Sequence, residues 1–172
     1  MKTFLLFRND IGVKSEPTKP TGPMTLSMAF NIINLALNVP SNYSVRWVYH
    51  KIPENYKMSI AVVDSGGNLI AFARKDDCPI GWIDVAIKKA KTSLYFNGRS
   101  EMFDFLVKPG SPYYSLLNSN GGLITFPGGY PIRSQVNGYR KLVGGIGIAG
   151  NDERIDGSLA RYVLGCKHGE RC

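Results

Sequence analysis

Residues 58–74 read MSIAVVDSGGNLIAFAR, and this stretch decides the fold. Its first seven residues are apolar and rich in β-branched side chains, which is typical of a strand. The next four, SGGN, are a turn sequence, and LIAFAR then returns as a second strand. We therefore expect an antiparallel hairpin made of residues 58–64 and 69–74.

Helical patterns flank this hairpin. Upstream, a cap at Thr25 or Ser27 begins a helix that runs to about Asn38. Its predicted apolar face holds Leu26, Ala29, Phe30, Ile33 and Leu37. Downstream, residues 81–96 form a helix with Lys88, Lys89 and Lys91 lying off its apolar stripe. A third helix begins at Asp152 and ends near Leu164.

A second strand pair is predicted between the last two helices. Residues 120–133 form a glycine-rich strand unit with Thr125 in mid-strand, and residues 142–149 are an apolar strand. Short turns join the strands of each pair, which implies an antiparallel sheet flanked by helices. The predicted fold class is therefore α/β in the broad sense, and α+β in the strict sense because the sheet is antiparallel. The 172 residues fit one domain at 24–165. Residues 1–23 are expected to be an N-terminal extension with a Pro-rich linker, and 166–172 a polar tail.

Charge and composition narrow the functional classes. Lys and Arg number 21 against 13 Asp and Glu, so the net charge of +8 attracts anions. The positive charges are scattered and form no nucleic-acid motif, so we expect no nucleic-acid partner. No apolar run reaches the length of a membrane helix, so we expect no membrane partner. The start MKTFLLFRND has only four consecutive apolar residues, too few for a signal peptide, which predicts a cytoplasmic protein.

Familiar catalytic motifs are absent from the sequence. It has no phosphate-binding P-loop, no GxSxG and no HExxH. The tail residues Cys166, His168 and Cys172 do not have zinc-site spacing, and we expect no metal site. His50 is either a haem axial ligand or an ordinary surface histidine.

Three polar residues are the best candidates for acid–base chemistry. Asp64 ends the first strand and is either catalytic or a turn cap, and Thr125 is either catalytic or an ordinary strand residue. Lys89 lies next to the apolar stripe, so it either reaches into a cleft or is a solvated charge. Two interpretations also stay open for the many glycines, which serve either ligand approach or close helix–sheet packing.

Five segments taken together resemble a known family. They are residues 59–69 (SIAVVDSGGNL), 81–93 (GWIDVAIKKAKTS), 108–112 (KPGSP), 119–132 (SNGGLITFPGGYPI) and 143–150 (VGGIGIAG). In this order they look like the GlcG/HbpS family of haem-degrading or haem-binding proteins, and are similar to the C-terminal domain of PduO adenosyltransferases. The resemblance implies an α/β/α sandwich that assembles as a homo-oligomer. It also implies that a tetrapyrrole, haem or cobalamin, binds near the glycine-rich motifs.

The resemblance assigns site residues one by one. The cofactor-binding candidates that match the family's motif are Asn120, Gly121, Gly122, Thr125, Phe126, Gly128 and Gly129. Arg133 is a further candidate, because the net positive charge favours ligand carboxylates and an arginine can pair with them. Lys89 matches the family's helix lysine, and Asp64 its turn aspartate. The leading hypothesis is a binding protein for a tetrapyrrole or similar anionic ligand in a glycine-lined cleft. The alternatives are a cofactor-independent isomerase, cyclase or lyase acting on a small carbonyl or carboxylate substrate, and an accessory protein whose glycines only pack subunits.

Overall fold

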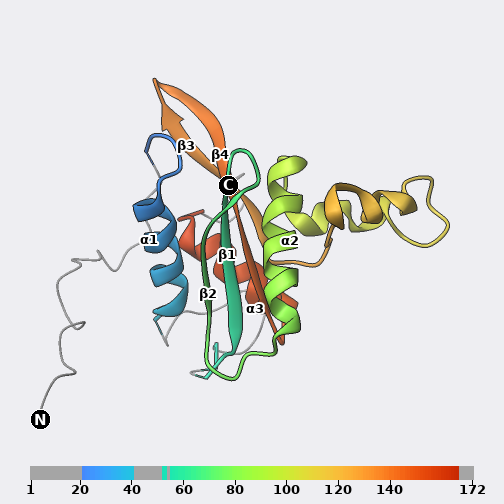
Figure 1. Cartoon of the computed structure of the whole chain (residues 1–172), viewed down its shortest axis with the longest axis horizontal. Coiled ribbons are helices and arrows are strands. Elements are labelled where there is room, and N and C mark those ends of the chain that lie inside the picture. The colour runs from blue at the N-terminus through green and yellow to red at the C-terminus, as the bar shows by residue number, and fades with distance from the viewer. Residues whose placement is uncertain (1–20, 41–51, 54, 167–172) are drawn as a thin grey trace, which may run out of the picture.

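The computed structural model describes residues 21–40, 52–53 and 55–166 (Figure 1). The expected extension at 1–23, apart from its last three residues, lies outside this part of the chain. So do His50 and nearly all of the polar tail. The three helices and the two hairpins predicted from the sequence all lie within it.

The sheet has four strands in the order β2-β1-β4-β3, and every neighbouring pair is antiparallel. The first hairpin, β1 (Met58–Asp64) and β2 (Leu69–Arg74), has the predicted bounds. The second consists of β3 (Gly129–Val136) and β4 (Tyr139–Gly150), joined at Asn137-Gly138. The central pair β1 and β4 is in register from Met58 opposite Gly150 to Asp64 opposite Gly144.

The expectation that Thr125 lies in mid-strand is wrong. It lies in the connection that precedes β3, because the strand begins only at Gly129. Gly121, Gly122 and Gly128 have φ values of 76°, 97° and 121°. These belong to the left-handed region, which breaks an extended strand.

Helices cover both faces of the sheet, so the predicted α/β/α sandwich is confirmed (Figure 1). Helices α1 (Leu26–Leu37) and α3 (Glu153–Val163) pack on the face that carries Ile60 and Val62. Helix α2 (Gly81–Tyr95) packs on the opposite face against Ala61 and Val63. Alternate residues of β1 thus serve the two layers, as the twofold period of a strand requires.

The buried faces of two helices differ from those predicted. On α1 the buried residues are Ala29, Ile32, Ile33 and Ala36, at helical i, i+3, i+4, i+7 spacing, whereas Leu26 and Phe30 are about half exposed. On α2 the buried residues other than Leu94 are small or polar, and they include Lys89. The prediction that all three lysines of this helix lie off the buried face is therefore wrong for Lys89.

An arm projects from the sandwich beside α2 (Figure 1). It consists of two 3-10 segments, η1 (Ser100–Leu106) and η2 (Tyr114–Gly121), and the connection between them. The glycine-rich loop of residues 119–128 leads from the arm back to β3.

Candidate functional site

The predicted cofactor-binding residues divide into an exposed group and a buried group. Asn120, Gly121 and Phe126 are exposed at the surface of the glycine-rich loop. Thr125, Gly128 and Gly129 are buried beneath them. Asn120 has a φ of 54°, so three successive left-handed residues turn the chain out of η2. Arg133 lies apart on β3, where its guanidinium donates to Asn97 beyond the end of α2.

Hydrogen bonds hold the glycine-rich loop against η1. The Ser100 hydroxyl donates to the carbonyl of Phe126 and accepts from the N–H of Gly129 at 2.9 Å. The Thr125 hydroxyl lies 3.5 Å from the Asp104 carboxylate. These bonds fix the backbone at Phe126 against η1 of the arm. The arm and this loop together expose five large apolar side chains, here named the arm surface: Met102, Phe105, Tyr113, Tyr114 and Phe126.

Glycines on the α2 side of the sheet serve close packing. A Cβ atom added at Gly145 or Gly147 would overlap the backbone oxygen of Ala90 or Ala86 on α2. At Gly129 it would overlap the backbone oxygen of Lys89. For these three glycines, the packing interpretation holds. No glycine-lined cleft opens at these positions, because helix α2 fills the space above them.

Lys89 forms a buried ion pair that joins two layers of the sandwich. Its side chain is 3% exposed, and its ammonium lies 3.0 Å from the carboxylate of Asp156, which is 1% exposed. The ammonium also donates to the carbonyl of Ile148 at 2.9 Å. Gly128 makes room for this arrangement, since a Cβ there would lie 3.0 Å from both the Lys89 nitrogen and the Asp156 Cβ.

Asp156 is the centre of a wider hydrogen-bond network. It accepts from the Tyr56 hydroxyl at 2.8 Å and from the Gly150 N–H at 3.0 Å. The Tyr56 hydroxyl also bridges to the backbone of Asp152, the N-cap residue of α3. Burial, followed by the charge of Asp156, raises the pKa of Tyr56. Burial also raises the pKa of Asp156, while the Lys89 ammonium opposes that shift.

Neither Asp156 nor Tyr56 is among the residues singled out from the sequence. A signal for Asp156 exists, because it lies three, four and seven residues before Leu159, Ala160 and Val163, all of which are buried. An aspartate at that spacing falls on the apolar face of the helix and needs a buried partner. Since the Lys89 ammonium is buried and bonded on both sides, its placement favours a structural role.

Asp64 lies in the turn between β1 and β2, where it caps the backbone. Its carboxylate accepts from the N–H groups of Gly66 and Asn68 at 2.8 and 2.9 Å. These bonds, that of Asn68 first, hold the pKa of Asp64 below its usual value. Asp64 is in register with Gly144, whereas Ile148, which binds Lys89, is opposite Ile60. Four residues of strand span roughly 14 Å, so Asp64 and Lys89 do not share a site.

Glu101 on η1 is a further group that sequence reasoning missed. Its Oε2 atom is buried and has no hydrogen-bond partner among the described residues. The other oxygen lies 3.4 Å from the guanidinium of Arg99. Burial raises the pKa of Glu101. The pKa of the neighbouring Tyr130 is also raised, by burial and then by the charge of Glu101.

The described residues also bear on metal-binding clusters and on membrane-spanning helices. Within residues 21–40, 52–53 and 55–166, His, Cys, Asp and Glu side chains nowhere gather in a group of three that could hold a metal ion. In the same part of the chain, every helix is too short or too polar to cross a membrane.

Comparisons with known proteins connect this fold to a family. The family model described as "Haem degrading protein HbpS-like" matches residues 46–164. The chain belongs to the HbpS-like family. This confirms the resemblance drawn from the five sequence segments.

Two curated relatives of this HbpS-like chain come from Citrobacter freundii. An uncharacterised 15.0 kDa protein of the dhaT-dhaS intergenic region is 31% identical over 65% of this chain and 77% of its own length. The corrinoid adenosyltransferase PduO is 29% identical over 61% of this chain, but only 30% of PduO is covered. The HbpS-like chain thus spans less than a third of that enzyme.

Solved structures share the fold. The crystal structure of the PduOC:heme complex superposes with a TM-score of 0.68, covering 87% of this chain and 99% of its own, at 20% identity. The Klebsiella pneumoniae protein ORFY also gives 0.68, covering 87% and 93% at 24% identity. At these identities the likeness concerns the fold.

Proposed function

We propose that this HbpS-like protein binds a tetrapyrrole, haem in the first place, on the arm surface beside the glycine-rich loop. The observation that carries the proposal is the arm itself, which presents five exposed apolar side chains next to the family's motif. We expect these side chains to form one patch, and large contiguous apolar patches mark binding sites. The fold shared with the PduOC:heme complex supports the choice of ligand.

The residues of the arm surface fit the chemistry of haem. Its flat macrocycle is apolar, so aromatic rings such as Phe126 and the thioether of Met102 make suitable contacts. Thioether and phenol groups are also known haem-iron ligands, which makes Met102, Tyr113 and Tyr114 the candidates among the described residues. Bound haem would supply the redox and ligand-binding chemistry of its iron.

Cations near the arm suit the propionate groups of haem. The Lys88 side chain lies against Gly122, since its ammonium would be 3.1 Å from a Cβ built there. It pairs with Asp84 at 2.8 Å and is partly exposed. Lys108 on the arm is 65% exposed.

The proposal also gives roles to the residues of the glycine-rich loop. Asn120, Gly121 and Gly122 shape the loop, and Thr125, Gly128 and Gly129 anchor it. Arg133 remains a proposed carboxylate partner. Cobalamin is the second tetrapyrrole to test.

The same surface supports a proposal of homo-oligomer formation. Side chains such as Phe105, which is 68% exposed, are costly to leave in water, and a second copy of the chain would cover them. A tetrapyrrole on the arm would then lie at a subunit contact. The acid–base enzyme alternative gains no comparable support, because Lys89 is buried in an ion pair.

The test is a titration of the purified protein with haem, read by visible absorption, with cobalamin in parallel. We expect a shifted, saturable band of fixed stoichiometry for haem. The variants Phe126→Ala and Met102→Ala should weaken binding or shift the band. Tyr139→Ala is the matched control, since Tyr139 is 72% exposed at the β3–β4 turn, away from the arm. Absence of a saturable band, or equal loss in the control, would overturn the proposal.

A further inference from the structure

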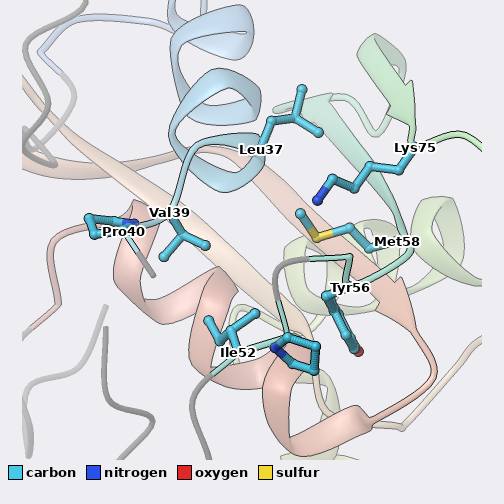
Figure 2. Close-up of a pocket in the computed structure, with 8 residues that line it drawn as sticks. Leu37, Val39, Pro40, Ile52, Tyr56, Met58 and Lys75 are labelled. Carbon is cyan, nitrogen blue, oxygen red and sulfur yellow. The ribbon is translucent and has the colours of Figure 1, made fainter. Parts of the chain in front are cut away.

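A separate pocket lies on the face of the sheet opposite α2 (Figure 2). Its volume is about 230 Å³. It lies where the end of α1, the approach to β1 and the end of β2 meet. Seven of its lining residues are apolar or aromatic: Leu37, Val39, Pro40, Ile52, Pro53, Tyr56 and Met58. The eighth is Lys75.

Lys75 provides the only charge among these lining residues. Its side chain is half-buried, and Figure 2 shows its ammonium pointing toward the pocket beside Leu37 and Met58. Among the described residues no carboxylate pairs with it. Asp77, two residues further on, instead pairs with Lys57 at 3.3 Å. An ammonium held beside apolar walls, with no counter-ion in the described part of the chain, favours binding of an anion.

We propose that this pocket binds a small apolar carboxylate. The carboxylate would pair with the Lys75 ammonium, and the apolar chain would lie along Ile52 and Met58, which are almost fully buried. One ammonium matches one carboxylate charge. A phosphate monoester would leave much of its second charge against apolar walls without a partner.

The size of the pocket limits the ligand further. Its volume of about 230 Å³ lies below the roughly 300–1,000 Å³ of pockets that enclose drug-sized molecules. At the ~30 Å³ that a water molecule takes in the liquid, it holds roughly eight non-hydrogen atoms. A tetrapyrrole is far too large, so this site is independent of the one proposed on the arm.

Hexanoate, a carboxylate with a five-carbon apolar chain, is the probe for this site. Titration of the full chain with sodium hexanoate, followed by calorimetry and by the NMR signal of the Met58 methyl group, should show saturable one-to-one binding. Lys75→Met should weaken that binding about tenfold or more, which is the usual worth of a charge-assisted hydrogen bond. Lys57→Met removes the same charge from a neighbouring lysine and should change the affinity less than about twofold. Neutral hexan-1-ol should bind as weakly to the native protein as hexanoate does to the Lys75 variant.

A variant that fills the pocket completes the test. Val39→Trp, at a half-buried lining position, should abolish hexanoate binding and leave the haem titration unchanged. The proposal is overturned by a lack of saturable hexanoate binding, by equal weakening in Lys75→Met and Lys57→Met, or by binding that survives Val39→Trp. Because Lys75→Met should not affect the haem band, failure of this site and failure of the arm site are distinguishable.

Discussion

The ammonium of Lys89, on the α2 side of the sheet, lies 3.0 Å from the carboxylate of Asp156 on α3, the helix that covers the opposite side. The two side chains meet beside Gly128, just before β3 begins at Gly129. A side chain at Gly128 would crowd this contact. The pair therefore links the two helical layers directly. The contact lies just before the start of β3, the edge strand of the sheet.

Breaking the Lys89–Asp156 pair should destabilise the protein strongly. Lys89→Met leaves the Asp156 carboxylate buried without its counter-charge, and such changes typically cost about 3–5 kcal/mol. Urea denaturation should show the loss as a lower midpoint. The double variant Lys89→Met/Asp156→Leu removes both charges and should recover much of the stability. A double variant no more stable than the single one would contradict the assignment.

Packing of α2 on the sheet should not tolerate a methyl group at Gly147. The added Cβ would overlap the backbone oxygen of Ala86, so the helix must move away from β4. We expect Gly147→Ala to cost about 1–3 kcal/mol or more, as overpacking does. Gly81→Ala is the matched control, since no atom lies within 4 Å of a Cβ placed there. Thermal unfolding should separate the two, and equal melting temperatures would refute the packing role.

The turn aspartate Asp64 should stabilise the fold only in its charged form. Its folded-state pKa lies below the ordinary value of 3.8, so its contribution is present above pH 3.8 and is lost as the pH falls through the folded-state pKa. Asp64→Asn should therefore be less stable than the native protein at pH 7, on the order of 0.5 kcal/mol. The gap should close in acid. Asp76→Asn, which removes the same charge at an exposed position, should change the stability at pH 7 by less.

Glu101 should have the opposite pH dependence. Its folded-state pKa is raised above 4.5, so the stability that its neutral form supplies is present below pH 4.5 and is lost as the pH rises through the folded-state pKa. Glu101→Gln should then be more stable than the native protein at pH 7, by about 1 kcal/mol, and equal to it in acid. Glu153→Gln changes the same charge at an exposed position and should have little effect. Lower stability of Glu101→Gln at pH 7 would show that the charge is instead well solvated.

Local sequence signals predict the elements of this fold well. The β1–β2 hairpin follows from its apolar run and SGGN turn, and the starts of α1 and α3 follow from Thr25 and Asp152. What fails is the direction in which side chains point. Phe30 is apolar yet exposed, and Lys89 is charged yet buried, because the partner element decides each case. Asp156, the partner of Lys89, is 67 residues away in the sequence.

The candidate site was less predictable than the fold. The segment SNGGLITFPGG is readily found, but its glycines differ in role in the structure. A Cβ placed at Gly121 would have open space around it, whereas Gly128 and Gly129 are enclosed by backbone and by the ion pair. Composition cannot distinguish these cases. The pocket beside Lys75 also has no sequence signature, since its walls come from three separate segments. The absence of a nucleic-acid partner and the cytoplasmic location stay predictions.

The close packing of the glycines beneath α2 has a consequence for how the sequence of such a chain can evolve. Because Ala86, Ala90 and the facing glycines leave no space between helix and sheet, the interior offers no room for a ligand there. The ligand binding that we propose would then be carried by side chains outside that layer, on the arm and near Lys75. Substitutions of exposed side chains on the arm would alter what is bound without rebuilding the interior. One scaffold of this design can therefore acquire new ligands at little risk to its folding.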